Sequence, residues 1–265
     1  MARHRTIDVL VIGAGGAGMT AALAARARGL DVCVVEATQQ VGGTTATSAG
    51  TLWLPGPHDP AAREYLRACI GSAACERKIA ALLESGHELL QFLHGRTQVR
   101  LDAVAVHPDY LQSLPGASVR GRAYAPREFD GRRLGSRFAR VRAPLPEFMV
   151  FGGMMVSKAD IPQLLTAGRD PKAAWHALKL VSRYAIDRLC GHSRGTRLVM
   201  GNALVAQLFA STIEAGIPTE FETAVAQVER QDTGFECVLQ TARAQVPVRV
   251  RHAIVLACGG YSGEP

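Results

Sequence analysis

The feature that most constrains the fold is the stretch IDVLVIGAGGAGMTAALAARARGLDVCVVEA at residues 7–37. The apolar run at 7–12 is typical of a strand that is buried on both faces of a parallel sheet. It leads into a glycine-rich turn, an alanine-rich helix at 19–28 and a second apolar strand at 31–35 that ends at Glu36. This order predicts a Rossmann-like nucleotide-binding fold, because it is the context in which GxGxxG binds a dinucleotide.

Each glycine of the turn has its own physical role. Gly13 permits the tight turn, Gly15 lets a pyrophosphate approach the backbone, and Gly18 lets the helix pack closely on the strand. The first N–H groups of the helix and its positive dipole end are available to phosphates. Glu36 can accept hydrogen bonds from a ribose diol and would repel a 2′-phosphate, which argues against NADP.

The fingerprint alone does not separate FAD from NAD. The residues that follow, TQQVGGTTATSAGTLWLP at 38–55, form a loop of small side chains. A simple NAD domain would continue with an ordinary helix and strand. A loop of small residues suggests a second backbone surface against a longer cofactor, whereas the alternative is a flexible surface loop.

The two glycine clusters, Glu36 and LWLP resemble the flavoproteins of the fumarate reductase and 3-ketosteroid 1-dehydrogenase superfamily. The resemblance implies an α/β fold of the glutathione-reductase type, with a parallel sheet, a small β-meander and FAD as the cofactor. Glycine and threonine backbone in the second cluster, main chain near Val225 and the final ACGG would then line the cofactor. Together with the first cluster, the residues expected to bind FAD are Gly13, Gly15, Gly16, Ala17, Gly18, Glu36, Ala37, Gly42, Gly43, Thr44, Thr45, Ser48, Ala49, Gly50, Val225, Ala257 and Gly259.

The chain is expected to form one FAD-binding domain, with its nucleotide-binding core at about 1–58 and 195–265 and a helical, Arg-rich excursion at about 59–194. Helices are predicted after Asp59, over 75–95, after Ser157, over 170–191 and from about 201. From residue 218 the pattern predicts a strand, a three-stranded meander and a return strand into the main sheet. His87 and His94 lie seven residues apart without a third ligand nearby, so no metal site is predicted.

The segment around VHPDY and FDGRRLG resembles the ketosteroid dehydrogenase branch. In that branch the tyrosine of this motif lies at the active site beside the steroid ring, and the matching position is Tyr110. The alternative is an ordinary half-buried aromatic side chain. Two neighbouring positions depart from the family pattern: His107 stands where a phenylalanine is frequent, and Leu111 stands where a second aromatic residue follows.

The formal net charge is +7, and eight arginines against two acids lie at 120–142. A basic patch can attract nucleic acid, lipid or an anionic cofactor. Without a nucleic-acid motif, we expect a solvated, arginine-rich loop and no nucleic-acid partner. Arg194 and Arg197 are weak candidates for contacts with an anion. The apolar stretch at 7–25 is interrupted by Asp8 and several glycines, and no signal peptide is evident, so we expect a cytoplasmic protein without a transmembrane segment.

Within the superfamily the chain continues past the ACGG motif into a substrate domain and then returns to the FAD domain. The main catalytic base and the groups that polarise the carbonyl lie in that later part. We therefore expect a truncated or split flavoenzyme, and the alternative is a complete FAD module without catalytic activity of its own. A complete module of this length would leave a sheet edge open and a flavin face uncovered, which favours the first interpretation.

The resemblance implies an FAD-dependent oxidoreductase that dehydrogenates a ketosteroid-like small molecule next to its carbonyl. A hydride would pass from a substrate carbon to flavin N5 while a protein base removes the neighbouring proton. The alternatives are a flavoprotein of the fumarate reductase type and a non-catalytic FAD-binding module. Because the sequence has no second GxGxxG, a quinone or a carrier protein is the expected electron acceptor rather than NAD(P)H.

Overall fold

The computed structural model describes residues 5–260, which divide into two units. Unit 1 comprises the described residues up to Ala49 and those from Glu128 onward, and unit 2 comprises Gly50–Arg127. The excursion predicted at about 59–194 is therefore shared between the units, since its first half lies in unit 2 and its second half in unit 1.

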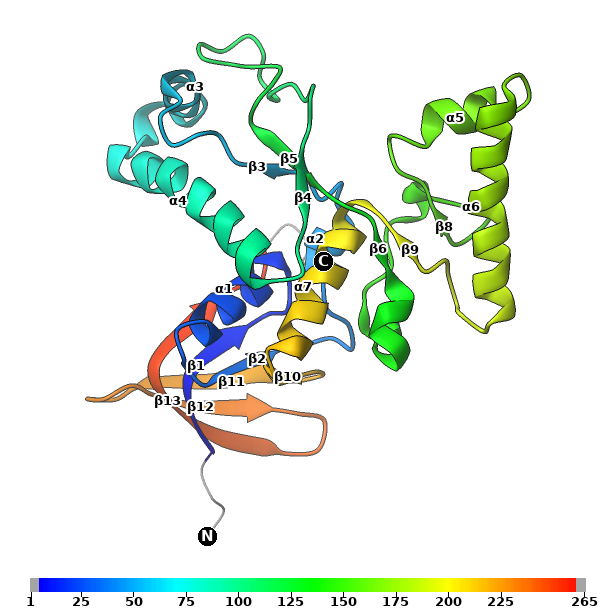
Figure 1. The fold of residues 1–265 in the computed structure, drawn as a ribbon. Coiled ribbons are helices and arrows are strands. Elements are labelled where there is room, and N and C mark those ends of the chain that lie inside the picture. Colours follow the sequence, from blue (N-terminus) through cyan, green and yellow to red (C-terminus); the bar gives the residue numbers. More distant parts are fainter. Residues whose placement is uncertain (1–4, 261–265) are drawn as a thin grey trace. The chain divides into compact units, whose positions relative to one another are not determined.

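Unit 1 is built on a six-stranded sheet with the order β10-β2-β1-β13-β12-β11 (Figure 1). Its first four strands are parallel, and β12 and β11 add to it in antiparallel fashion. All four residues of β2 are buried, as the apolar sequence predicts for a strand covered on both faces. The strands are β1 (Arg5–Ile12), β2 (Val32–Val35), β10 (Thr219–Glu220), β11 (Ala224–Arg230), β12 (Phe235–Gln240) and β13 (Gln245–Leu256).

Strand β13 joins the meander to the main sheet. Its first residues pair with β12, and the stretch from Val248 to Leu256 pairs with β1. The predicted meander is confirmed. Its third strand and the predicted return strand are one continuous strand, because no turn residue interrupts 248–256 and both edges of β13 find partners.

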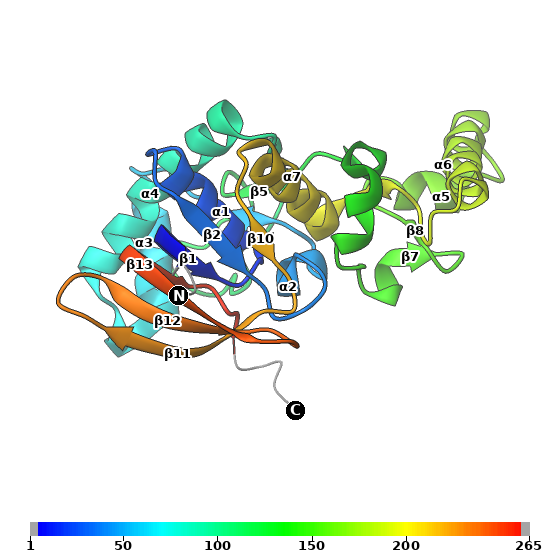
Figure 2. The same ribbon diagram turned by 90° about the horizontal axis from the view of Figure 1, so that it is seen from below.

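Helices α1 (Gly16–Arg26) and α7 (Met200–Glu214) contact each other, and α1 packs on β1 and β2 (Figure 2). The twelve residues from Gly201 to Thr212 are all buried. A helix with apolar residues on every side requires such burial. Helix α7 also contacts the short helix α2 (Gly43–Ala46), which carries the second glycine cluster.

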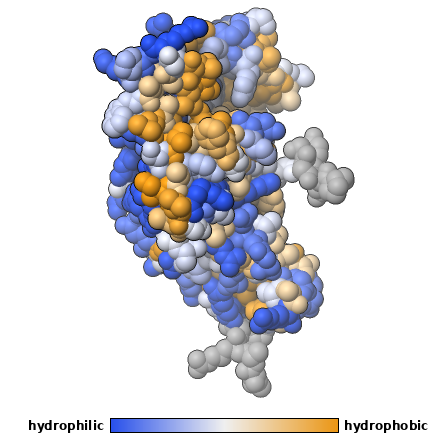
Figure 3. Space-filling model, turned by 90° about the vertical axis from the view of Figure 1, so that its right-hand side faces the viewer, coloured by the Kyte–Doolittle hydropathy of each residue, from blue (hydrophilic) through white to orange (hydrophobic). Residues whose placement is uncertain are grey.

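The rest of unit 1 lies between residues 128 and 198. Helix α6 is capped by the Asp170 carboxylate, which accepts hydrogen bonds from the backbone N–H groups of Lys172 and Ala173. Its side chains Trp175, Leu178 and Ile186 are exposed. Figure 3 faces the side on which Figure 1 draws α6 and shows hydrophobic residues gathered on that surface. The remaining elements of this part are β6 (Phe129–Asp130), η2 (Gly131–Arg140), η3 (Pro146–Phe148), β7 (Met149–Val150), β8 (Met154–Met155), α5 (Ile161–Thr166), α6 (Pro171–Leu189) and β9 (Arg197–Leu198).

The carboxylate of Asp160 is the centre of a buried hydrogen-bonded cluster in unit 1. It accepts hydrogen bonds from the backbone N–H and the hydroxyl of Ser157, at 2.8 and 2.7 Å, and from Arg197 at 2.9 Å. His176 Nε2 lies 2.9 Å from its other oxygen. Burial alone would raise the pKa of Asp160, but the hydrogen bonds from Ser157, Arg197 and His176 lower it to about 2.

We expect this cluster to make unit 1 sensitive to acid. The unfolded chain binds the Asp160 proton at an ordinary pKa near 3.8, above the folded value of about 2. The contribution of this carboxylate to the free energy of unfolding is therefore present above pH 4. It decreases by about 2 kcal/mol as the pH falls towards 2. In urea unfolding between pH 2 and 5, the free energy of unfolding of Asp160→Asn should depend less on pH than that of the unchanged chain. Parallel profiles would contradict the prediction.

Unit 2 contains a three-stranded antiparallel sheet and two helices. The sheet has the order β3 (Leu52–Trp53), β5 (Ala123–Pro126) and β4 (Leu101–Ala103). Helix α3 (Pro60–Ile70) begins with Asp59 as its N-cap and Pro60 at its first position, as predicted. It continues through η1 (Gly71–Ala73) to α4 (Glu76–Arg96). Among residues 5–260, no helix is long and apolar enough to cross a membrane.

Candidate functional site

The two glycine clusters, which lie almost thirty residues apart in the sequence, meet in unit 1. Gly15 and Gly42 form a parallel β-bridge, and the Gly42 N–H donates to the carbonyl oxygen of Ala14 at 2.8 Å. The Gly16 N–H donates to Thr45 Oγ1 at 3.2 Å. The start of α1 and the start of α2 therefore form one continuous main-chain surface, which we call the glycine cradle (residues 13–18 and 42–46).

The glycines of the cradle fall into two kinds. A Cβ at Gly13, where φ is +105°, would overlap the backbone of Ala257, and a Cβ at Gly18 would overlap the carbonyl oxygen of Gly13. At Gly15 and Gly43 the nearest protein atom to such a Cβ is 3.9 Å away. Packing of the protein thus explains Gly13 and Gly18, and the positive φ of +49° explains Gly43, whereas Gly15 leaves space for a ligand that lies directly on the backbone.

The open side of the cradle suits a diphosphate. Gly15 is the N-cap of α1, and the first turn of this helix carries no acidic residue. The first N–H groups of a helix and its positive dipole end attract an anion. An open backbone at Gly15 beside this helix start fits the pyrophosphate of a dinucleotide cofactor.

The carboxylate of Glu36 is held at the edge of the cradle. Its Oε2 accepts a hydrogen bond from the Ala14 N–H at 2.9 Å, and its Oε1 accepts from the backbone N–H and the hydroxyl of Thr38 at 3.0 and 2.9 Å. The Thr223 N–H donates to the backbone oxygen of Glu36, which brings the start of β11, with Val225, to this edge. The half-buried carboxylate is thus oriented where a ribose hydroxyl could donate to it.

The other predicted cofactor residues of unit 1 also lie at the cradle. The Ala257 N–H donates to the carbonyl oxygen of Ile12 at 2.8 Å, so the end of β13 stands beside Gly13, and Gly259 follows with φ +90°. Ser48 and Ala49 follow directly after the last turn of α2. Gly50 is the first residue of unit 2.

Asn202 was not among the predicted site residues, yet it supports the cradle. Its side-chain amide donates to the carbonyl oxygen of Ala46 at 2.7 Å, and the residue is completely buried. A Cβ at Gly201 would overlap the carbonyl oxygen of Thr45, so glycine lets α7 begin against α2. The Gly-Asn pair at the start of the predicted helix is the sequence feature from which this supporting role could have been inferred.

The two arginines predicted as weak anion candidates make contacts within unit 1. Arg197 is bound to Asp160 and Glu128. Arg194 is 8% exposed, stacks on the Phe138 ring at 4.7 Å and donates to the carbonyl oxygen of Val141. Burial lowers the pKa of Arg194 to about 10.

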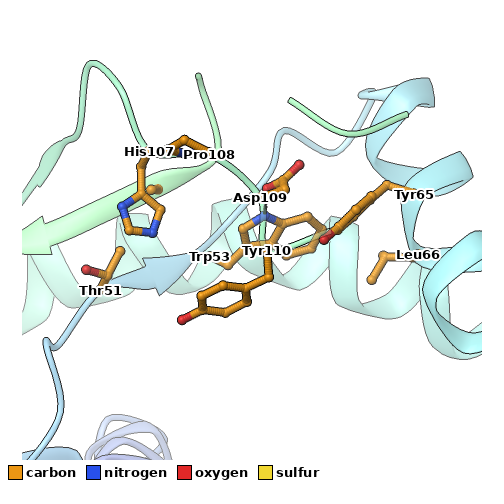
Figure 4. A pocket seen from close by; sticks show the side chains of 9 residues that line it. Thr51, Trp53, Tyr65, Leu66, His107, Pro108, Asp109 and Tyr110 are labelled. Carbon is orange, nitrogen blue, oxygen red and sulfur yellow. Dashed lines mark hydrogen bonds between the residues drawn. The ribbon is translucent and has the colours of Figure 1, made fainter. Parts of the chain in front are cut away.

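Tyr110 belongs to a separate pocket within unit 2 (Figure 4). Its side chain is 97% exposed, so the alternative of a half-buried aromatic residue is wrong. The pocket encloses about 270 Å³ and has mostly aromatic and aliphatic walls. Its lining residues are Thr51, Trp53, Tyr65, Leu66, His107, Pro108, Asp109, Tyr110 and Ala123.

A buried ion-pair network fixes the segment that carries Tyr110. Arg122 Nη1 donates to Asp109 at 2.6 Å, and Arg122 Nε donates to Asp59 at 2.9 Å. Trp53 Nε1 donates to the other oxygen of Asp109 at 2.7 Å. Along this extended segment Asp109 points inwards and Tyr110 outwards, so the network holds the tyrosine at the pocket. The sequence contained Asp109 and Arg122 in the motifs PDY and Gly-Arg, but their pairing was not predicted.

The family model described as an FAD binding domain matches residues 8–265 of this chain. Nearly the whole chain is thus covered, including both glycine clusters, Glu36 and the pocket of unit 2.

Several characterised proteins are similar over nearly all of this chain. A 3-oxosteroid 1-dehydrogenase of Mycolicibacterium smegmatis is 33% identical over 96% of this chain and 47% of its own length. A 4-oxocyclohex-2-ene-1-carboxylate 5-dehydrogenase of Sinomonas cyclohexanicum is 33% identical over 99% of this chain and 46% of its own length. The chain therefore spans about half the length of these relatives.

The fold also matches a solved structure. The 3-ketosteroid delta1-dehydrogenase from Sterolibacterium denitrificans, in complex with 1,4-androstadiene-3,17-dione, superposes with a TM-score of 0.85 at 27% identity. The match covers 97% of this chain and 48% of that chain. The expected α/β flavoprotein fold is confirmed.

Proposed function

Since this chain belongs to the family of FAD binding domains and takes FAD as its cofactor, we propose that it serves an FAD-dependent oxidoreductase that dehydrogenates a cyclic ketone next to its carbonyl group. The best-supported substrate class is a 3-ketosteroid. The observation that carries this proposal is the 33% identity to a 3-oxosteroid 1-dehydrogenase over 96% of the chain. In this chain Tyr110 lines a largely apolar pocket.

The residues of unit 1 would hold the cofactor. The open backbone at Gly15 and Gly43 and the start of α1 suit the pyrophosphate, and Glu36 suits a ribose hydroxyl. The end of β13 and the start of β11 would line the rest of the dinucleotide. When bound, FAD supplies an acceptor for the hydride that leaves the substrate carbon.

The residues of unit 2 would act on the substrate. Trp53, Tyr65 and Leu66 offer flat apolar surface to a ring system, and burying such surface contributes about 25 cal/mol per Å². The exposed hydroxyl of Tyr110 would donate a hydrogen bond to the substrate or transfer a proton at the substrate's carbonyl group. We further propose that electrons leave to a quinone or a carrier protein.

A second substrate class has comparable support. The relative from Sinomonas cyclohexanicum, whose name gives a ring ketone with a carboxylate as its substrate, is also 33% identical to this chain. Both classes are cyclic ketones that gain a double bond conjugated with the carbonyl group. The type of reaction is therefore the same for both candidates.

The proposal predicts a large effect at Tyr110. In the FAD-loaded natural protein, Tyr110→Phe should lower kcat for ketone-dependent reduction of an artificial electron acceptor by about 100-fold, as expected for loss of a proton-transferring or hydrogen-bonding group. The control is Tyr184→Phe, which removes an exposed hydroxyl that bonds to the Phe151 carbonyl oxygen in unit 1. Absence of turnover with either ketone class despite full FAD loading would reject the proposed function.

A further inference from the structure

We infer that the pocket of unit 2 binds a compact cyclic ketone that carries a carboxylate, with His107 and Thr51 as the residues that bind the carboxylate. The inference rests on the proposed function and names the substrate class within it. It is carried by the uneven chemistry of the pocket wall, by the paired state of Asp109 and by the volume of the pocket.

One end of the pocket is apolar. Tyr65 is 7% exposed and its ring lies 6.2 Å from that of Trp53, while Leu66 lines the same end (Figure 4). The hydrogen bond from Trp53 to Asp109 fixes the indole ring. Such a surface suits the carbon skeleton of a ring, because rigid aromatic walls lose little entropy on binding.

The opposite end of the pocket is polar. His107 and Thr51 both line it, and Figure 4 shows them together, away from Tyr65 and Leu66. Within the part of the chain that the structure describes, neither the imidazole nor the Thr51 hydroxyl has a hydrogen-bond partner. The His107 N–H donates to the Val119 carbonyl oxygen at 2.9 Å, which holds the backbone that carries the imidazole. An imidazole N–H and a hydroxyl can donate to the same carboxylate.

The charge of the pocket permits a carboxylate there. Asp109 is the acid among the lining residues, and it is 6% exposed. Its two oxygens accept hydrogen bonds from Arg122, Trp53 and the Ser118 N–H. Because Arg122 donates directly to this carboxylate, repulsion of an anionic ligand is weaker than that of an unpaired acid, although Arg122 is shared with Asp59.

The part of the pocket that unit 2 supplies has room for a compact ring. Its volume of about 270 Å³ lies near the lower limit of about 300 Å³ for sites that enclose drug-sized molecules. The sequence agrees with this interpretation, since His107 and Leu111 stand where the ketosteroid branch resembled by this segment has aromatic residues. Imidazole in place of phenyl exchanges apolar contact for a hydrogen-bond donor.

The inference can be tested by calorimetric titration of the FAD-loaded protein with 4-oxocyclohexanecarboxylate and with its methyl ester. The acid should bind at least 10-fold more tightly than the ester, because only the acid accepts charge-assisted bonds from His107 and Thr51. His107→Phe should weaken binding of the acid about 10-fold and leave the ester unchanged. His107→Gln keeps a donor and should retain part of the preference, and Thr51→Val should lose part of it.

Equal affinities for acid and ester, or an unchanged preference in His107→Phe, would overturn the inference. Tighter binding and faster turnover of 4-androstene-3,17-dione, independent of residue 107, would also overturn it and would leave the proposed function standing. Failure of the proposed function is a different result, namely no turnover of either ketone by the FAD-loaded protein. The unfolding temperature of each variant serves as the control for folding, since His107 lies at the surface of a loop.

Discussion

Replacing Gly15 by alanine should abolish FAD binding without unfolding the protein. The backbone at Gly15 has φ −79°, which alanine adopts freely, and a Cβ there would meet no protein atom within 3.9 Å. The free energy of unfolding should therefore stay within about 0.5 kcal/mol of the unchanged chain. The new methyl group would occupy the space through which a pyrophosphate approaches the backbone, so FAD affinity should fall at least 100-fold. Flavin fluorescence on titration and thermal unfolding of the flavin-free protein measure the two effects.

Gly18→Ala is the matched variant with the opposite behaviour. Its Cβ would overlap the Gly13 carbonyl oxygen and would lie 3.3 Å from the Ala257 side chain. Helix α1 would have to move away from β1, at a cost of about 3 kcal/mol or more in the free energy of unfolding. If both variants unfolded, or if Gly15→Ala still retained FAD, the distinction between packing glycines and ligand glycines in the cradle would be wrong.

Arg122→Ala should destabilise unit 2 by about 3–5 kcal/mol, because it leaves a buried carboxylate without its partner. The side chains of Arg122 and Asp109 are only 3% and 2% exposed. Arg122 also pairs with Asp59, the N-cap of α3, and its hydrogen bond helps to keep the pKa of that carboxyl below its usual range. The indole of Trp53 would lose a fixed partner, so intrinsic fluorescence should change together with stability.

Arg127→Ala is the control for this prediction. Arg127 pairs with Asp102 at 2.7 Å, but the two side chains are 61% and 56% exposed. An ion pair in water contributes little, so the loss should be within about 0.5 kcal/mol. Urea unfolding of the two variants compares them directly. A similar effect of both substitutions would show that burial does not determine the contribution of Arg122.

The elements that are determined by residues close together in the chain could be predicted from the sequence. The strand, glycine turn, helix and second strand up to Glu36 follow one another within thirty residues, and the meander is built from neighbouring segments. Each of these steps is determined by periodicity and by turn residues that lie close together in the sequence. The same holds for the Asp59 cap, which formed where it was expected.

The interactions between distant residues could not be predicted in this way. The basic run at 120–142 suggested a solvated loop, yet Arg122 is buried in an ion pair, and Arg133 and Arg140 lie over the rings of Phe129 and Phe221 at 4.8 and 4.7 Å. Charge density in a sequence does not show that Arg122 will meet the carboxylate of Asp59, 63 residues away. The division into units likewise depends on contacts between segments that are far apart in the chain.

The position of strand β13 has a consequence for how the protein acquires its flavin during synthesis. The glycine turn leaves the ribosome first, but the backbone wall beside Gly13 is supplied by Ala257, 244 residues later. At typical elongation rates this interval lasts roughly 10–50 s. Until then β1 lacks its neighbouring strand on that side. Cofactor capture by this fold therefore has to wait until strand β13 has left the ribosome.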